Sequence, residues 1–355
     1  MSIYTPAHPR GVEPSLRHAN NFDFLRLAAA LVIIVSHACA LQVGYAAIPG
    51  NSPALLVGQA ALASLFVISG YLIPQSWMAQ PDVKRYFWKR SLRVFPALVP
   101  ALIFMLLIIG PLATTLPLAD YFMTLFSPFT LASPGSVWNG SALGLFQSNP
   151  VTFVNASLWT IPVEFVMYIL VALLGVVGLL RRKDVLLGLI AADFALWTVV
   201  SGDHGLAKVR FTLYFLIGAY LAVHHREHRY DPATAALLAV ALAAASQTPY
   251  VTYLALVAVP YIVLTVAHLG VPALNTFGDR GDFSYGVYIY AYPVQQTIVL
   301  YLGTSMPLWI FSALSILLTF PLAYASWHLI ERRALALKQV EFRDRADVLS
   351  TGQNP

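Results

Sequence analysis

Ionisable side chains within the long apolar segments of this chain are few, and His37 and Arg26 are two of them. His37 lies deep in the first apolar segment, and Arg26 lies near its start. Eleven residues are about three helical turns plus roughly 20°, so on a helix the two side chains share a face about 16 Å apart. Asp23, one turn before Arg26, is its predicted ion-pair partner. Because an ionisable residue within a membrane span costs about 2.5 kcal/mol or more, these positions indicate function.

Glu164 is the predicted partner of His37. If its helix starts at the outer surface near Ser157, the carboxylate lies about 10 Å inside, and His37 lies about 22 Å from the inner start of its own helix. In an apolar core about 30 Å thick these depths are similar, so a pair can form in which the carboxylate orients the imidazole. Pro162 would free a carbonyl there, as suits a cavity wall. Two structural alternatives stay open: a His37 that only joins helices, and a protonated Glu164 bonded to backbone.

Arg90 and Arg93 are a candidate phosphate-binding pair. They are three residues apart, so on a helix they share a face, at the end of a strongly basic stretch. Two guanidinium groups suit a phosphate-bearing ligand, although lipid headgroups or topology alone would also account for them. Ser69 and Tyr71 close the apolar segment that precedes this stretch and are candidate substrate contacts.

A stripe of hydroxyl groups follows the ninth apolar segment. Ser284 and Tyr288 belong to it, and Tyr292 lies too deep for an interfacial tyrosine, so we expect it to face the interior. Arg210 stands at the outer end of the sixth segment, where basic residues are otherwise rare. It is a further candidate ligand residue.

The elements that must position these residues are membrane helices. Hydrophobic residues make up 58% of the 355 residues and charged residues only 10%, where a soluble domain has about 25%. The mean hydropathy is +0.70. A single cysteine, Cys39, excludes an internal disulfide. The composition therefore predicts an all-α, polytopic membrane bundle.

About ten segments are long and apolar enough to be spans, with short ones at the sixth and seventh places. They cover residues 22–42, 55–73, 94–116, 158–179, 185–200, 208–223, 233–247, 249–268, 283–302 and 307–330.

The basic residues set the predicted orientation. Nineteen of the 21 Lys and Arg residues fall in alternate connecting segments, which the positive-inside rule places in the cytoplasm together with both termini. They are topology determinants, so the net charge of +5 predicts no nucleic-acid partner. The domains are a cytoplasmic leader (1–21), a transmembrane domain (22–330) and a cytoplasmic tail (331–355). The longest outer segment, 118–157, is a candidate acceptor surface.

Several motifs in order resemble the acyltransferase-3 family, membrane proteins that O-acylate surface polysaccharides, lipopolysaccharide, nodulation factors and macrolides. The resemblance covers about residues 20–335. The matching segments are Asn21 to Arg26 with His37, Leu65 to Ile73, Arg85 to Pro96, Leu158 to Tyr168 (which contains Trp159), Phe215 to Ala219, Ser284 to Pro293 and Ile330-Glu331. The usual histidine of the ninth-helix motif is absent, because Tyr290, Ala291 and Tyr292 stand there.

The resemblance implies a multi-pass enzyme of the bacterial inner membrane. Acyl-CoA, usually acetyl-CoA, would be a co-substrate from the cytoplasm, with no permanently bound cofactor and no metal. Its phosphates would lie near Arg90 and Arg93, and Arg26 would line a channel for the thioester. His37, backed by Glu164, would act as general base or carry the acyl group.

The implied acceptor is a hydroxyl of a glycan or lipid-linked saccharide at the outer face, beside membrane lipid. Trp159 and the hydroxyl-bearing residues above would contact substrate. Two other functions stay open. A transporter or exporter of a polysaccharide precursor or small solute would also hold an intramembrane histidine and glutamate, although the halves show no inverted repeat. A non-catalytic sensor or assembly partner is the third.

Overall fold

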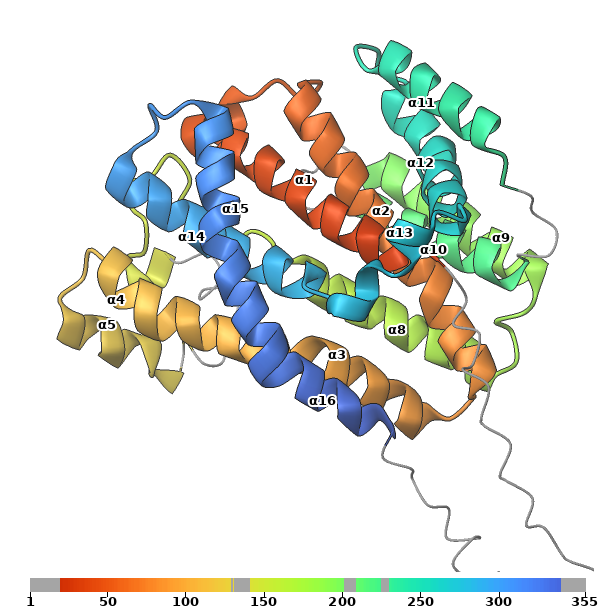
Figure 1. Ribbon diagram of the computed structural model, residues 1–355, viewed down its shortest axis with the longest axis horizontal. Coiled ribbons are helices and arrows are strands. Elements are labelled where there is room, and N and C mark those ends of the chain that lie inside the picture. Colours follow the sequence, from red (N-terminus) through yellow and green to blue (C-terminus); the bar gives the residue numbers. More distant parts are fainter. Residues whose placement is uncertain (1–19, 129, 131–140, 201–208, 225–229, 340–355) are drawn as a thin grey trace, which may run out of the picture.

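The computed structural model describes residues 20–128, 130, 141–200, 209–224 and 230–339. Over these residues the chain is helical, as predicted (Figure 1). The described part contains no strand, and its one β-type pairing is an isolated bridge between Thr114 and Leu145. Most of the predicted leader and tail lies outside the described residues.

Each of the ten predicted apolar segments coincides with a helix. The long helices are α1 (Phe22–Val43), α2 (Pro53–Ala79), α3 (Val83–Ile103), α8 (Thr160–Val176), α9 (Lys183–Val200), α10 (Arg210–Val223), α11 (Pro232–Ala245), α12 (Val251–His268), α14 (Ser284–Leu302) and α15 (Leu308–Ser326). Shorter ones are α4 (Gly110–Ala113), α5 (Leu118–Leu125), α13 (Pro272–Asn275) and α16 (Arg332–Ala336). Wider π turns at Phe104–Ile109 and Trp327–Glu331 join α3 to α4 and α15 to α16.

Five helical stretches in the described part are long and apolar enough to cross a membrane. They are Phe22–Val43, Pro53–Ala79, Val83–Ala113, Val251–His268 and Leu308–Ala336. Three more helices, α8, α10 and α11, are apolar but shorter. The protein is thus a multi-pass membrane protein, and the count of ten spans and the cytoplasmic termini remain predictions.

The basic stretch before the third predicted span is itself helical. Asp82 caps α3 by accepting a hydrogen bond of 2.6 Å from the backbone N–H of Arg85. The helix therefore begins at Val83, about eleven residues before the apolar segment, because the basic residues favour helix as much as the apolar ones do. Arg90 and Arg93 consequently lie on a helix, as their spacing requires.

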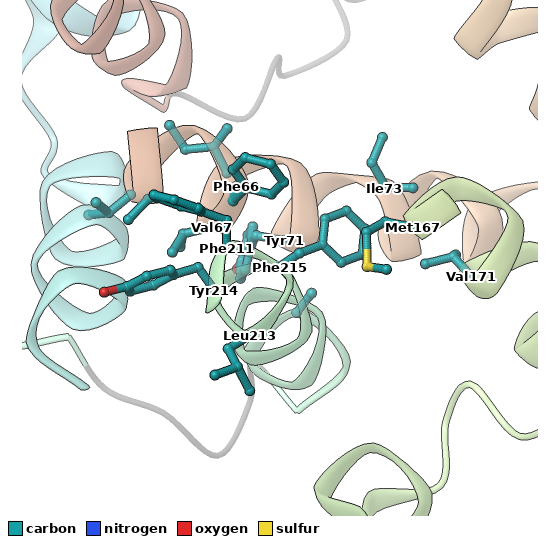
Figure 2. Close-up of a cluster of buried hydrophobic side chains, with 14 of the residues drawn as sticks. Phe66, Val67, Tyr71, Ile73, Met167, Val171, Phe211, Leu213, Tyr214 and Phe215 are labelled. Atoms are coloured by element: carbon teal, nitrogen blue, oxygen red, sulfur yellow. The ribbon is translucent and has the colours of Figure 1, made fainter. Parts of the chain in front are cut away.

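The core of the bundle forms where α2 meets α10. A side chain at Gly70 would collide with the backbone carbonyl of Phe215, and one at Gly218 would collide with that of Val67. Glycine at both positions lets the two backbones approach closely, as small residues do in membrane helices. Around this contact α2, α8, α10 and α12 bury the largest hydrophobic cluster, part of which Figure 2 shows.

The segment before α8 folds back into the bundle. Its apolar residues Leu143, Leu145, Phe146 and Val154 are fully buried. Pro293 interrupts the backbone hydrogen bonds of α14 and leaves the carbonyl of Ile289 free. That carbonyl accepts a hydrogen bond of 2.9 Å from the Asn155 amide.

One glutamine side chain of α14, that of Gln296, fixes the same segment. Nε2 of Gln296 donates to the carbonyls of Val151 and Phe153 at 2.8 and 2.6 Å. The amide of Asn149 in turn donates to Gln296. The segment that was predicted to be an outer surface is therefore, from 143 to 158, largely interior.

The depth of Glu164 in the membrane stays a prediction. Ser157, just before α8, is buried within the protein, with an exposed fraction of 2%. The helix begins at Thr160, inside the protein. Pro162 lies in its first turn, where the missing N–H costs no helical hydrogen bond. It therefore marks the start of the helix and, contrary to the prediction, does not free a helical carbonyl.

Candidate functional site

A cavity of about 140 Å³ brings together seven of the twelve predicted site residues, and we call it the charged cavity. Its predicted lining residues are Arg26, Ser69, Arg90, Arg93, Glu164, Ser284 and Tyr288. They come from α1, α2, α3, α8 and α14, so the cavity lies where five helices meet. Apolar side chains such as Phe66 and Ile161 complete its wall.

Two of the arginines are held by one carboxylate, that of Asp282. Nη2 of Arg93 lies 2.6 Å from Oδ2 of Asp282, and Nη1 of Arg26 lies 3.7 Å from the same oxygen. Arg26 also pairs with Asp23 at 2.7 Å, which confirms the predicted local partner. The two guanidinium groups are thereby fixed side by side, although they lie in α1 and α3.

Asp282 precedes α14 and is ionised at any physiological pH. Burial by itself raises the pKa of this carboxyl, but the charges of Arg93 and Arg26 outweigh burial and lower the pKa to about 2. The hydroxyl of Ser284 also donates to the carboxylate. Ser284 therefore both lines the cavity and helps to hold the Asp282 carboxylate in place.

Arg90 differs from the other two arginines because no described carboxylate pairs with it. Its guanidinium lies over the ring of Tyr168, 6.0 Å from the centroid, and its buried Nε–H has no hydrogen-bond partner within the described structure. A buried donor without a partner costs about 1–3 kcal/mol, more for a charged group. Arg90 is thus the cation with the greatest capacity to bind an incoming anion.

Lys338 adds a fourth positive charge to this end of the cavity. It follows α16, which runs beside α3 (Figure 1), and Nε1 of Trp88 donates to the Leu337 carbonyl at 3.3 Å. Burial, together with the positive charges of Arg93, Arg90 and Arg26, lowers the pKa of Lys338 to about 8, while Asp282 opposes this shift. The packing of α16 and of the turn after it on α3 brings this lysine towards the arginines.

Glu164 contacts hydroxyl groups. Its Oε1 accepts a hydrogen bond of 3.1 Å from Ser69 of α2 and another from Tyr168, one turn further along α8. The backbone-bonded alternative is therefore not what the structure shows. The carboxylate instead joins α8 to α2 at the wall of the charged cavity.

The predicted direct pair between His37 and Glu164 is wrong. The His37 ring packs edge-on against Tyr292 of α14 at a centroid distance of 5.0 Å, and none of the hydrogen bonds of the described residues joins it to Glu164. Glu164 and Arg90 both line the charged cavity, and His37 is not among its lining residues. His37 lies two turns beyond Ala30, the last α1 residue of the cavity wall, or about 10 Å along the axis.

Tyr288 connects the two places. Its ring lines the charged cavity, and its hydroxyl lies 3.1 Å from both Thr160 Oγ1 and the Ser157 carbonyl. Tyr292, fully buried, lies one turn further along α14 beside His37. The predicted hydroxyl stripe therefore runs from the arginines towards the histidine.

Three predicted residues lie away from the charged cavity. Tyr71 faces the other side of α2, where its hydroxyl is 3.3 Å from Nε2 of His268. The Trp159 ring packs on the Phe211 ring at a centroid distance of 5.7 Å. Arg210 lines a second, separate cavity.

Sequence reasoning missed three polar groups of the site. Asp282 lies in a connecting segment, and only its position just before a span could have drawn attention to it. Tyr168 was detectable, because it is four residues from Glu164 and so on the same helix face. Lys338 had no local signal, since only the packing of α16 along α3 brings it to the arginines.

Comparison with known proteins identifies the family. Residues 20–328 match the family model described as "Acyltransferase domain". The chain is 29% identical to a protein named O-acetyl transferase from Shigella phage Sf6, over 90% of this chain and 97% of that one. It is also 29% identical to Nodulation protein 10 of Rhizobium leguminosarum bv. viciae, over 92% and 96%. No solved structure gives a significant match. Since the family model covers most of the chain, this protein belongs to the acyltransferase-3 family and is an acyltransferase.

Proposed function

We propose that the protein transfers an acyl group, in the simplest case acetyl, from acyl-CoA in the cytoplasm to a hydroxyl of a glycan or lipid-linked saccharide at the outer side of a bacterial inner membrane. The observation that carries the proposal is the charged cavity. Its three arginines lie inside an apolar bundle together with Glu164, and Asp282 pairs with two of them. The likeness to a relative named O-acetyl transferase supports acetyl as the group transferred.

The arginines support an acyl-CoA donor. Asp282 neutralises part of the charge of Arg93 and Arg26, and Arg90 and Lys338 remain for phosphate oxygens. Charge-assisted contacts between guanidinium and phosphate are shorter and roughly twice as strong as neutral hydrogen bonds. CoA phosphates at Arg90 and Lys338 would leave the pantetheine arm and thioester to enter between α1 and α14.

His37 supports the chemical step. As general base its imidazole would take the proton of the acceptor hydroxyl as the oxygen attacks the thioester carbonyl. The new C–O bond forms, the C–S bond breaks, and the proton passes to the sulfur to give free CoA. A transient acyl-histidine is the second route, in which the imidazole nitrogen forms the first bond to the acyl carbon. Tyr292, packed against the ring, would hold its orientation in either route.

Purified protein in lipid nanodiscs tests the proposal with acetyl-CoA carrying a labelled acetyl group. We expect transfer to a saccharide acceptor, or slow hydrolysis when no acceptor is present. Two results together would contradict the proposal. Without an acceptor, CoA would be released no faster than background, and extracts of the host's glycans would give no labelled product. A transporter would instead move solute across proteoliposomes without consuming acetyl-CoA.

Cysteine labelling tests the orientation. Gly50 lies before α2 with open space around it, and Lys183 is exposed at the start of α9. With Cys39 replaced by Ala, Gly50→Cys should react with an impermeant thiol reagent in intact cells, and Lys183→Cys should react only after permeabilisation. The reverse pattern would refute the predicted cytoplasmic termini.

A further inference from the structure

A second cavity, of about 310 Å³, lies among α2, α10, α11 and α12, and we call it the apolar cavity. Its wall is formed mostly by aliphatic and aromatic side chains, among them Leu56, Leu242 and Val259, with Arg210 as its one charged residue. It shares no lining residue with the charged cavity. Nothing in the proposed acyl transfer uses it.

A layer of aromatic side chains separates the two cavities. Phe66 lines the charged cavity and Phe211 lines the apolar one, and their rings touch at a centroid distance of 5.7 Å. The Trp159 ring also packs on Phe211, at a centroid distance of 5.7 Å. Figure 2 shows Phe66, Phe211 and Tyr214 together in this layer. A ligand of the apolar cavity would therefore press on the wall of the charged one without entering it.

Arg210 is the polar end of the apolar cavity. Its guanidinium carbon lies 5.1 Å from the ring centroid of Phe211, so the charged group rests on an aromatic side chain of the wall. No carboxylate among the described residues pairs with it. Asp193, on the neighbouring helix α9, is engaged by the Thr212 hydroxyl at 2.5 Å. Within the described residues, the partner of this cation is thus an aromatic ring, and burial of a charge without an anion is costly.

Helix ends of both kinds reach the apolar cavity, because Leu242 and Ala243 in the last turn of α11 line it as well. First-turn residues of three helices line the cavity: Pro53 of α2, Arg210 of α10, and Val251 of α12. Each helix N-terminus presents unpaired N–H groups and the positive end of its dipole. The loops at this end are tied together by Asn51, whose amide donates to Gln247 at 2.9 Å. The α11 C-terminus opposes the dipoles of the three N-termini, so Arg210 is the charge that a ligand of this cavity would meet.

We propose that the apolar cavity binds one membrane lipid with an anionic phosphate headgroup, with the phosphate at Arg210 and a hydrocarbon chain among α2, α11 and α12. The charge pattern selects this occupant, because a single cation above an apolar wall complements a molecule with one anion and an apolar chain. A soluble anion would leave the apolar wall empty, and an uncharged lipid would supply no anion to Arg210. The inference does not depend on the identity of the acyl donor.

Native mass spectrometry of the purified, delipidated protein tests the proposal with phosphatidylglycerol and, as the zwitterionic reference, phosphatidylcholine. We expect one phosphatidylglycerol to bind at least about tenfold more tightly than phosphatidylcholine. Arg210→Gln should remove most of this preference, and Arg210→Lys should retain part of it. Arg182→Gln, at an exposed site on the protein surface, is the matched control and should leave the preference unchanged.

Filling the cavity is the second arm. Ala243 of α11 and Ala255 of α12 both line it, and Ala243 is exposed, so Ala243→Phe should fold even if Ala255→Phe does not. We expect either substitution to weaken binding of phosphatidylglycerol about tenfold or more. Equal affinity for the two lipids, an unchanged preference in Arg210→Gln, or undiminished binding in Ala243→Phe would each overturn the proposal.

Discussion

The charged cavity and the apolar cavity lie on either side of the contact between Phe66 and Phe211, and they treat positive charge in opposite ways. In the charged cavity Arg26 and Arg93 share one carboxylate, Asp282, which fixes them in place. In the apolar cavity Arg210 has a phenyl ring beneath it and no described acid beside it. The charged cavity therefore holds several cations in fixed positions, where they can bind an anion together. The apolar cavity has a single cation, which suits an amphiphile with one anionic group.

This difference decides what each cavity can bind. A ligand with several phosphates needs several cations whose mutual repulsion is already compensated, as Asp282 does for two of them. A lipid needs one cation and a long apolar wall. The following substitutions test that division, beginning with the largest expected effect.

His37→Ala should reduce acyl transfer per folded molecule by about 10²–10⁴, because a general base or acyl carrier is lost. The measurement is the initial rate of labelled product formation, normalised to monodisperse protein. His268→Ala is the matched control, since His268 bonds Tyr71 and the Leu264 carbonyl outside both cavities. It should lower the melting temperature and leave the specific activity intact. Normal specific activity in His37→Ala would remove the histidine from the chemical step.

Asp282→Asn should destabilise the protein by about 3–5 kcal/mol, because removal of a buried partner leaves Arg26 and Arg93 uncompensated. Thermal unfolding in detergent measures the loss. CoA should restore more stability to this variant than to the native protein, since its phosphates replace the missing negative charge. Asp184→Asn breaks an exposed ion pair with Arg182 and should leave the melting temperature unchanged. Equal melting temperatures for both variants would show that Asp282 does not organise the arginines.

The sequence predicted where the helices lie better than how their side chains meet. Hydropathy placed all ten helices, and helical spacing predicted the Asp23–Arg26 pair and the shared face of Arg90 and Arg93, because these depend on the local chain. The pairing of His37 with Glu164 failed for a non-local reason. Glu164 accepts hydrogen bonds from Ser69 and Tyr168, while His37 packs on Tyr292, and these partners are decided by how the helices pack.

The same limit explains the residues that were missed or placed elsewhere. Tyr71 and Ser69 are two apart on α2, so they point to different sides of the helix, and only the packing decides which side holds the cavity. Asp282 and Lys338 reach the arginines from other parts of the chain, about 190 and 245 positions from Arg93 by number. Such contacts have no signature in a single sequence.

Arg90→Gln should raise the KM for acyl-CoA roughly 10- to 150-fold with little change in kcat, because one charge-assisted phosphate contact is worth about 1.5–3 kcal/mol. Stability should rise slightly or stay the same, since Nε of Arg90 has no partner in the described structure to lose. Steady-state kinetics with varied acetyl-CoA measures the effect, and Arg182→Gln controls for the loss of one surface charge. A fall in kcat at constant KM would place Arg90 at the reacting atoms and not at the phosphates.

Lys338 should give acyl-CoA binding a pH dependence. Because its pKa is about 8, it loses its charge as the pH rises through that value, while the CoA phosphates, with a second pKa near 6, stay fully ionised. The KM for acyl-CoA should therefore rise between about pH 7 and pH 9, by roughly fivefold if the contact is worth about 1 kcal/mol. Folding stability moves the other way. The unfolded chain holds this proton up to pH 10.5, so it binds more protons than the folded protein above pH 8, and stability increases with pH across that interval.

The opposite directions separate a local effect from unfolding at high pH. Lys338→Gln should have a KM that is already raised at pH 7 and does not change up to pH 9, whereas Lys183→Gln, exposed at the start of α9, should keep the native profile. Isothermal titration with CoA at pH 7, 8 and 9 measures the same trend without turnover, and the melting temperature in parallel reports stability. If Lys338→Gln keeps the native pH profile, the titrating group lies elsewhere, and the phosphate site is formed by the arginines alone.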